Sequence, residues 1–260
     1  MLLAIDIGNT NTVIGLLDGE NIEKHWRTST HKKETPDELS LRILALFDRD
    51  KVKKENVSAV IISSVVPTLD DPYRRMIQYL FNKEAMIIEH SLDLGIKIKT
   101  DYPEELGADR LVNAVACHQL YSGPCIIVDF GTATTFCVIS AAGEYLGGAI
   151  VPGITVSAEA LFSFASKLPQ IDIVKPPTVI GKNTVQGMQS GIIYGYASMV
   201  EGLISKMKKE IGSTPKVLAT GGLAPIISEA CDCIDVIEPN LTLKGLSIIH
   251  QKNKGTLEKK

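Results

Sequence analysis

The sequence predicts an α/β protein of two related halves, each a mixed β-sheet flanked by helices. Short apolar runs typical of buried strands alternate with stretches whose apolar residues recur at helical spacing. The strand–turn–strand segment at 4–14 recurs at 126–136, which indicates an internal duplication. The 260 residues suffice for two domains. We expect these domains at 1–118 and 119–250, followed by a disordered, lysine-rich tail at 251–260.

The first half opens with a hairpin and continues with a clearly marked helix. Residues 2–5 and 13–17 have the apolar character of paired strands on either side of a glycine turn. Thr35 can cap a helix, Pro36 suits its first position, and Glu38 completes a capping box. Further along, the pattern predicts a strand, a helix, a short strand and another helix, at 57–62, 71–81, 86–88 and 110–120.

The second half repeats the strand–turn–strand unit and adds a long helix. Asn183 is placed to cap this helix, which we expect to run to about Ile211. The other predicted elements are a hairpin, a helix, two strands and a last helix, at 143–153, 155–164, 216–219, 234–237 and 241–249.

Charge and hydropathy narrow the class of partner. The formal net charge of −3 gives no basic surface for a nucleic acid. The apolar run at 2–5 is cut short by Asp6, so it cannot be the hydrophobic region of a signal peptide. No apolar run approaches the roughly 20 residues of a membrane span. We therefore expect a cytoplasmic protein that binds neither nucleic acid nor membrane.

The common nucleotide-binding motifs are missing from the sequence. Gly181-Lys182-Asn183-Thr184 resembles the end of a P-loop, but that motif requires glycine at position 176, where proline stands. It also requires serine or threonine at position 183. Gly-x-Gly-x-x-Gly does not occur either, so a dinucleotide-binding fold has no support.

The duplicated turn offers another way to bind a nucleotide. It is a polar loop between two strands, rich in backbone N–H groups and hydroxyls, and it can approach a polyphosphate closely. Asp6 is placed to hold the Mg²⁺ of that polyphosphate. In the direct alignment of the two copies, Asp6, Gly8 and Thr12 match Asp129, Gly131 and Thr135.

Five short motifs, taken in order and with their spacing, resemble the type III pantothenate kinases. They lie at 6–13, 107–110, 129–135, 181–184 and 219–222. This family belongs to the actin-like ATPase superfamily, whose two domains have a ribonuclease H-like fold. The resemblance implies transfer of the ATP γ-phosphate to the 4′-hydroxyl of pantothenate, giving 4′-phosphopantothenate in the first step of coenzyme A biosynthesis.

The resemblance also implies which residues bind ATP and cations. The first turn would hold the ATP phosphates through Asp6, Ile7, Gly8, Asn9, Thr10, Asn11, Thr12 and Val13, with Asp6 toward Mg²⁺. Thr132 would contact the phosphates from the second half. Asp129 would bind a monovalent cation, K⁺ or NH₄⁺. The glycine turn at 220–222 would pass beside the nucleoside.

Pantothenate would be bound and activated by a second group of residues. The resemblance makes Asp109 the base that accepts the proton of the hydroxyl, and the substrate-binding residues are Gly107, Ala108, Asp109, Arg110 and Thr184. Each has a structural alternative: Asp109 could cap the helix that follows, Arg110 could pair with a nearby glutamate, and Thr184 could be a helix-start hydroxyl. The family often has a tyrosine where this chain has Thr100, so Tyr102 either replaces that aromatic side chain or the pocket lacks it.

Oligomeric state and two competing functions complete the predictions. Gly187, Gly191 and Gly195 form one stripe on the long helix. This stripe would let another helix approach, from the same chain or from a partner, and the resemblance favours a homodimer. The alternatives to a kinase are a non-catalytic accessory protein on the same fold and an actin-like phosphatase or sugar kinase.

Overall fold

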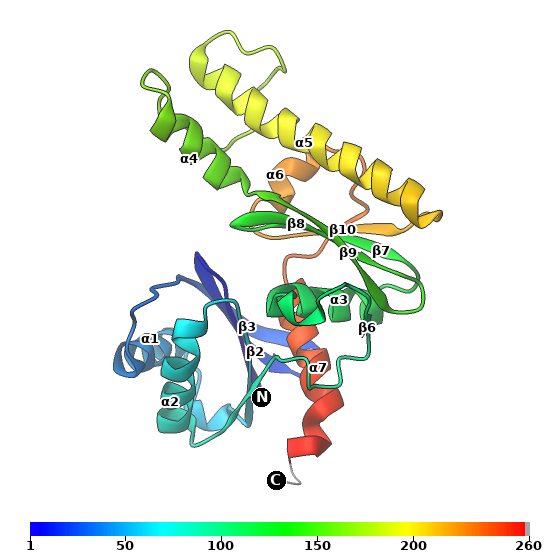
Figure 1. The fold of residues 1–260 in the computed structure, drawn as a ribbon. Helices are drawn as coiled ribbons and strands as arrows, with labels where there is room; N and C mark the ends of the chain where they lie inside the picture. Colours follow the sequence, from blue (N-terminus) through cyan, green and yellow to red (C-terminus); the bar gives the residue numbers. More distant parts are fainter. Residues whose placement is uncertain (258–260) are drawn as a thin grey trace. The chain divides into compact units, whose positions relative to one another are not determined.

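The computed structural model describes residues 1–257 and divides them into two compact units (Figure 1). The first unit consists of residues 1–95, 102–119 and the segment from 241 onward. The second consists of residues 96–101 and 120–240. Each unit contains one mixed sheet with helices packed on it. The predicted α/β class with two related sheets is therefore confirmed.

The sheet of the first unit has the strand order β3-β2-β1-β4-β5. Its central strand β1 pairs antiparallel with β2 and parallel with β4. Residues 2–5 of β1 are all buried, as in a strand that is covered on both faces. The strands are β1 (Leu2–Ile7), β2 (Asn11–Asp18), β3 (Asn21–Ser29), β4 (Ala59–Ser64) and β5 (Ala85–Ile87).

Helices cover both faces of this first sheet. On one face, Leu3 and Ile5 belong to the same core as Ile43 of α1 and Tyr73 of α2. The other face meets α7, whose Leu243 lies beside Gly15 of β2. The helices of this unit are α1 (Pro36–Arg49), α2 (Asp70–Phe81), α3 (Ala108–Leu120) and α7 (Leu241–Leu257), with short 3₁₀ helices at Lys54–Asn56, Pro67–Leu69 and Pro103–Glu105.

The sheet of the second unit has the order β11-β10-β7-β8-β9-β6. Here β7 pairs antiparallel with β8 and parallel with β10, the same relations that β1 has with β2 and β4. Its strands are β6 (Lys97–Ile98), β7 (Cys125–Phe130), β8 (Ala133–Ile139), β9 (Glu144–Pro152), β10 (Lys216–Thr220) and β11 (Val236–Ile237). Its helices are α4 (Ile154–Phe164), α5 (Thr184–Ile211) and α6 (Ala224–Ser228).

Two predicted helix starts are confirmed in atomic detail. The Thr35 hydroxyl accepts the backbone N–H of Glu38, and the Glu38 carboxylate accepts that of Thr35 at 2.8 Å. Asn183 caps α5 by accepting the backbone N–H of Gln186 at 2.9 Å. Such caps satisfy N–H groups that have no partner within the helix.

The predicted disordered tail is wrong for residues 251–257, which continue α7; residues 258–260 lie outside the described residues. Asn253 is 3% exposed, and its side chain donates to the carbonyl of Asp93 and accepts its N–H. A buried amide with both groups bonded fixes the helix end, although lysines surround it in sequence. This helix also belongs to the first unit, whereas the sequence placed it in the second domain.

Three further elements were not predicted. Strand β3 buries only Trp26 and otherwise lies at the sheet edge, so its sequence has little apolar periodicity. Strand β6 has two residues and helix α6 has five, which is too short for a sequence pattern. No helix within residues 1–257 combines the length and the apolar character needed to cross a membrane.

Candidate active site

The turn between β1 and β2 consists of Gly8, Asn9 and Thr10. The Gly8 N–H donates to the carbonyl of Asn11 at 3.0 Å, and the Thr30 N–H donates to that of Thr10 at 2.9 Å. A Cβ at Gly8 would lie 2.8 Å from the Asn11 oxygen, so the tight turn requires glycine. Asn9 and Thr10 are exposed, which leaves an open polar loop at the end of the sheet.

The turn between β7 and β8 is shorter and consists of Gly131 and Thr132. The Gly131 N–H donates to the carbonyl of Ala133 at 3.1 Å. The Thr132 carbonyl accepts the N–H of Gly153, the residue just before α4, at 3.1 Å. A Cβ at Gly153 would lie 2.2 Å from that same oxygen. The turn is therefore held directly against the N-terminus of α4, which favours anions.

The strand register corrects the direct alignment of the two turns. Thr12 pairs with Ile7, and the corresponding partner of Phe130 is Thr134. Thr12 therefore corresponds to Thr134, and the expected match with Thr135 is wrong. The reason is the length of the turn, since three residues connect the strands in the first unit and two in the second. Thr12 and Thr134 are both fully buried.

Asp6 lies near the end of β1, between two strands. Its register partners are Val13 on β2 and Ser63 on β4. The Ser63 hydroxyl is buried and has no hydrogen-bond partner within the described residues. Asp6 is half-buried, and its register partner on β4 carries an unsatisfied polar group, as expected at a site for a polar ligand.

Asp129 occupies the corresponding place on β7 and faces a narrow cradle. Its register partners are Thr135 on β8 and Thr220 on β10. Gly221 follows with φ +91°, and a Cβ there would lie 2.6 Å from the Phe130 carbonyl oxygen and 2.8 Å from Asp129 Oδ1. One carboxylate oxygen and one carbonyl oxygen therefore converge on a point that only glycine leaves open.

Asp109 lies in the first turn of α3 with its carboxylate folded against the backbone. Its Oδ1 accepts the N–H of Arg110 at 2.7 Å. A Cβ at Gly107 would lie 2.7 Å from the same oxygen, so Gly107 makes room for this arrangement. Burial raises the pKa of Asp109 above its ordinary value, and the hydrogen bond and charge of Arg110 only partly offset this. The carboxylate therefore lies in a buried environment that disfavours its charged form, and it also binds the start of the helix.

Backbone contacts connect the first turn with the segment that contains Asp109. The N–H of Val65, just after β4, donates to the carbonyl of Ile7 at 3.0 Å. The Val65 side chain also lies 3.7 Å from the Cβ position of Gly107. This role of Val65 could not be predicted, because a single apolar residue after a strand carries no motif.

Helix α7 supports α3 from behind. A Cβ at Gly245 would lie 2.3 Å from the Val112 carbonyl oxygen, which shows how closely the two helices approach. Thr242 donates to the side chain of Asn113 at 2.8 Å. These contacts fix the position of the helix that begins with Asp109.

Three further positions singled out in the sequence lie outside the two turns and the Asp109 segment: Thr184, Thr100 and Tyr102. Thr184 is the first residue of α5 and is exposed, while Asn183 is the cap, so the hydroxyl of Thr184 is not needed for capping. The Thr100 hydroxyl is buried without a partner among the described residues. Tyr102 is 63% exposed and is thus available as an aromatic surface.

The predicted site residues are divided between the two units. The first-turn residues and the 107–110 segment belong to the first unit, and Asp129, Thr132 and Thr184 belong to the second. Within residues 1–257, no three His, Cys, Asp or Glu side chains are arranged to hold a metal ion. Each of these two strand ends therefore offers a metal ion a single carboxylate, that of Asp6 on β1 and that of Asp129 on β7.

Solved structures of low sequence identity share this fold. A protein from Campylobacter jejuni, provisionally titled a Baf family transcriptional activator, matches with TM-score 0.61 and 19% identity, covering 97% of this chain and 99% of its own. Component A of (R)-2-hydroxyglutaryl-CoA dehydratase from Acidaminococcus fermentans gives 0.54 and 14%, with 98% of both chains. An inorganic polyphosphate/ATP-glucomannokinase from an Arthrobacter species gives 0.50 and 14%, with 95% and 96%. The fold is that of the actin-like ATPases and sugar kinases, as predicted.

Sequence relatives define the family. Residues 2–206 match the model described as type III pantothenate kinase. Type III pantothenate kinases from Geobacillus kaustophilus and Halalkalibacterium halodurans are each 49% identical over 253 residues, covering 97% of this chain and 98% and 100% of theirs. The chain belongs to the type III pantothenate kinase family.

Proposed function

We propose that this protein transfers the γ-phosphate of ATP to the 4′-hydroxyl of pantothenate in the cytoplasm, as the first step of coenzyme A biosynthesis. The observation that supports it most is Asp109, a carboxylate of raised pKa held at a helix start by the Arg110 N–H. It occupies the place where the family resemblance puts the base.

Asp109 accepts the proton of the substrate hydroxyl. Its Oδ1 is bonded to the backbone at 2.7 Å, so Oδ2 is the oxygen that meets the substrate. Phosphoryl transfer passes through a loose transition state, in which the hydroxyl proton leaves late. A carboxylate of raised pKa then takes the proton more readily, because proton affinity follows basicity.

The polar turn of each unit contributes to phosphate binding. Gly8, Asn9 and Thr10 present backbone N–H groups and side chains on an open loop, and the N-terminus of α4 beside Thr132 favours negative charge. Mg²⁺ is usually held by one or two carboxylates together with phosphates and water. Asp6, beside the unpartnered hydroxyl of Ser63, fits this pattern and would hold Mg²⁺, which neutralises phosphate charge.

Asp129 would bind a monovalent cation. Two oxygen atoms that can act as cation ligands lie at the Gly221 cradle: Oδ1 of Asp129 and the carbonyl oxygen of Phe130. One negative charge with carbonyl groups suits a weakly hydrated ion such as K⁺ or NH₄⁺ better than a small divalent ion, which dehydrates reluctantly. The bound ion would offset the charge of the phosphates near Thr132.

The residues that would bind pantothenate are Gly107, Ala108, Asp109, Arg110 and Thr184. The guanidinium of Arg110 offers a planar fork of donors that matches the pantothenate carboxylate. The exposed hydroxyl of Thr184 is a further hydrogen-bonding group at the start of α5. Tyr102 supplies the aromatic side chain that Thr100 lacks.

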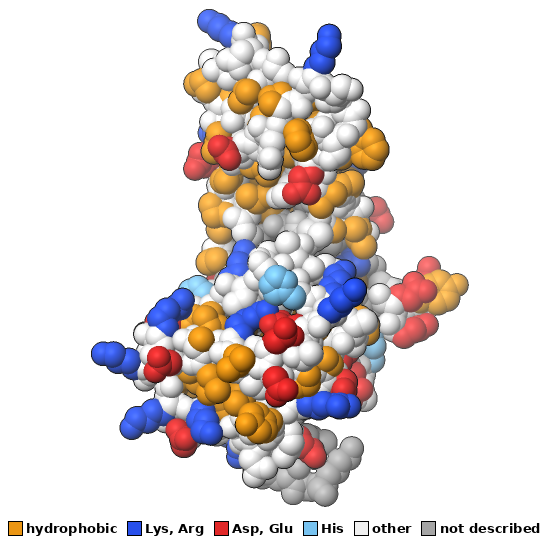
Figure 2. Space-filling model, turned by 90° about the vertical axis from the view of Figure 1, so that its left-hand side faces the viewer, with side chains coloured by type: hydrophobic (Ala, Val, Ile, Leu, Met, Phe, Trp, Pro, Cys, Tyr) orange, Lys and Arg blue, Asp and Glu red, His pale blue; other side chains and the backbone are white. Residues whose placement is uncertain are grey.

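We further propose that the protein is a homodimer joined through the second unit. A Cβ at Gly187, Gly191 or Gly195 would meet no atom within 4 Å, so no other segment of residues 1–257 packs against this stripe. Glycine inside a helix costs about 0.8–1 kcal/mol relative to alanine, which a close partner helix would offset. Figure 2 shows hydrophobic side chains over the surface of this unit. Those exposed on α4 include Val156, Leu161, Phe162 and Phe164.

A coupled assay tests the reaction. Purified protein with Mg²⁺, K⁺ and ATP should release ADP only when pantothenate is added. ADP release that does not depend on pantothenate would favour another kinase or phosphatase of this fold. No ATP turnover at all would favour an accessory protein.

Light scattering tests the dimer. The wild type should have twice the chain mass of 28.2 kDa. Gly191→Leu should give a monomer, with Ser198→Leu, at an exposed position on the same helix, as the matched control. A monomeric wild type with full activity would remove this part of the proposal.

A further inference from the structure

Two cysteines outside the kinase site lie almost in contact. Cys231 and Cys233 follow α6 and flank Asp232, and their sulfur atoms are 3.0 Å apart. Cys231 is 4% exposed, while Cys233 is partly exposed and lines a cavity of about 450 Å³. The sulfur of Cys233 is thus reachable from solvent, whereas the adjacent sulfur of Cys231 is buried.

We propose that Cys231 and Cys233 form a redox-active dithiol, which small anionic disulfides oxidise reversibly through the cavity beside α5. This site is independent of phosphoryl transfer and uses none of the residues assigned to it. The supporting features are the contact between the sulfurs, the carboxylate that positions their turn, and the lysines at the cavity.

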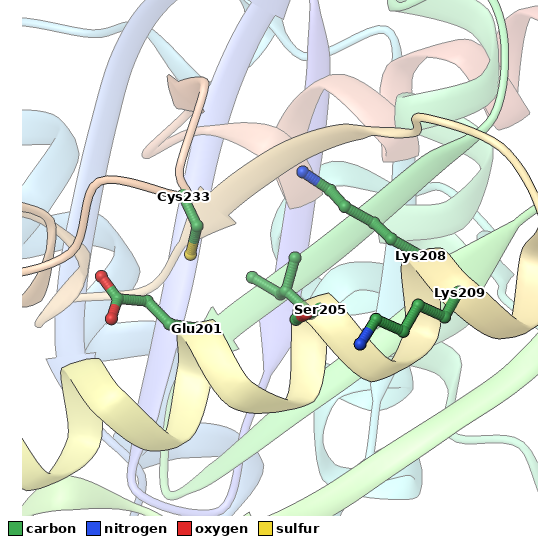
Figure 3. A pocket seen from close by; sticks show the side chains of 6 residues that line it. Glu201, Ser205, Lys208, Lys209 and Cys233 are labelled. Carbon is green, nitrogen blue, oxygen red and sulfur yellow. The ribbon is translucent and has the colours of Figure 1, made fainter.

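The turn is positioned by Glu201 of α5. The Glu201 carboxylate accepts the N–H of Asp232, the residue between the two cysteines, at 3.2 Å. Figure 3 shows Cys233 pointing toward α5, with Glu201 and Lys208 on either side. One hydrogen bond therefore holds the backbone in the shape that keeps the sulfurs adjacent.

The two thiols differ in acidity because they share a hydrogen bond. The hydrogen bond between the two sulfurs lowers the pKa of Cys231 and raises the pKa of Cys233. The Glu201 charge raises the pKa of both. The hydrogen bond thus makes it easier for the pair of thiols to lose one proton. The thiolate formed in this way is the reactive species in disulfide exchange.

The distance between the sulfurs favours a disulfide over a metal site. Two thiolates bound tetrahedrally to one Zn²⁺ at about 2.3 Å are separated by roughly 3.7 Å. The observed 3.0 Å is shorter, and no third His, Cys, Asp or Glu completes a metal cluster among residues 1–257. A shift of about 1 Å brings the sulfurs to the disulfide length of about 2.05 Å.

The cavity determines which oxidant can reach Cys233. Its other residues come from one face of α5: Glu201, Ile204, Ser205, Lys208 and Lys209. Among the charged lining residues, Lys208 and Lys209 outnumber Glu201, so the cavity favours an anion, and the oxidant is a low-molecular-weight disulfide with carboxylate groups.

The exchange proceeds in two balanced steps. The exposed sulfur of Cys233 attacks one sulfur of the disulfide RSSR while its proton passes to the Cys231 thiolate across the 3.0 Å contact; this forms a mixed disulfide and releases RS⁻, which takes up a proton. Cys231, deprotonated, then attacks the Cys233 sulfur and expels the second RS⁻. In total, the two cysteines lose two electrons and two protons, and RSSR is reduced to two RSH.

Peptide-level thiol labelling in glutathione buffers tests the proposal on the full protein. After equilibration and acid quenching, free thiols are alkylated, and the peptide with both cysteines is quantified by mass spectrometry. The ratio of unlabelled to doubly labelled peptide should rise tenfold for each tenfold rise in [GSSG]/[GSH]², as a two-electron exchange requires. Cys137, a free thiol that is 2% exposed in the same unit, should stay labelled throughout. Persistent double labelling in excess GSSG would overturn the proposal.

Single substitutions separate the roles of the two sulfurs. Cys231→Ser should trap a glutathione adduct on Cys233, because the second step is blocked. Cys233→Ser should react at least about tenfold more slowly, since the remaining thiol is buried. Glu201→Gln should accelerate the first step, because it removes the charge that raises both pKa values while keeping an acceptor for Asp232. Equal reactivity of both cysteines would contradict the assigned order.

A matched pair of oxidants tests the cavity. In Lys208→Gln/Lys209→Gln, the rate with anionic oxidised glutathione should fall by about threefold or more at low salt. The rate with cationic cystamine should not fall. Equal loss with both oxidants would show that the lysines act only through structure.

Discussion

The β1–β2 turn and the β7–β8 turn are two versions of one design. Both begin after an aspartate near the strand end, and both place a fully buried threonine just beyond the turn. The first has three residues and accepts the N–H of Thr30, just after β3, whereas the second has two and accepts the N–H of Gly153, just before α4. The difference of one residue in length thus goes with a different neighbour for each turn, the end of β3 in the first unit and the start of α4 in the second.

Replacing the two aspartates should produce the largest effects and the clearest contrast. Asp6→Asn should lower kcat by about 100- to 1000-fold in any monovalent salt, the scale for loss of an electrostatic contact to transferring phosphate. Asp129→Asn should instead bring the rate in K⁺ down to the rate in Na⁺. Steady-state assays in both salts measure this. Equal cation dependence in the two variants would show that the turns do not divide the metal ions as proposed.

Asp109 lies outside both turns, so replacing it tests whether the residues of the turns alone account for kcat. Asp109→Asn should lower kcat by about 100-fold or more while ATP binding persists. Because its pKa is raised, wild-type kcat should fall as pH decreases through that pKa, and the variant should lack this limb.

The same substitution should increase stability. A raised native pKa means that the folded protein binds the proton more tightly than the unfolded chain does, so the contribution to stability is lost as pH rises through it. At neutral pH the buried charge is therefore unfavourable, and Asp109→Asn should raise the denaturation midpoint. A lower midpoint would identify Asp109 as mainly a helix-start residue.

Two glycines distinguish the cradle from the turn beside it. Gly221→Ala places a Cβ 2.6 Å from the Phe130 oxygen at a positive φ, so it should destabilise the protein by about 1–3 kcal/mol and abolish activation by K⁺. Gly131→Ala meets its nearest atom at 3.4 Å and should retain that activation. Denaturant unfolding and cation titration together decide whether the cradle holds the ion.

The smallest expected difference concerns the two buried threonines. Thr12 shares a 2.9 Å hydrogen bond with Thr30, whereas the Thr134 hydroxyl has no partner within residues 1–257. Thr12→Val should therefore destabilise by about 1 kcal/mol, and Thr134→Val should be neutral or stabilising. Equal losses in urea unfolding would mean that Thr134 is satisfied by bound water.

Local signals in the sequence were sufficient for most of the fold. The Thr35 capping box and the buried run of β1 each depend on neighbouring residues, which a sequence displays directly. Contacts distant in sequence were not accessible in this way. The hydrogen bonds of Asn253 to Asp93 order a segment that its lysines suggested was disordered, and they connect residues 160 positions apart.

The candidate site shows the same division. Asp6, Asp109 and Asp129 were found from motifs, but the raised pKa of Asp109 arises from burial, which no motif encodes. The register of Thr134 became visible only when the strands paired, because a one-residue difference in turn length is invisible in an ungapped alignment.

The return of α7 to the first unit affects the order in which the protein can fold during synthesis. Residues 120–240 of the second unit leave the ribosome before α7 exists, although β1 of the first unit was made long before. Until α7 arrives, the face of β1 that it covers stays exposed, and so does the side of α3 beside Val112. The nascent first unit must therefore be shielded while a whole second unit is translated, and chaperones that bind exposed apolar strands should engage it in that interval.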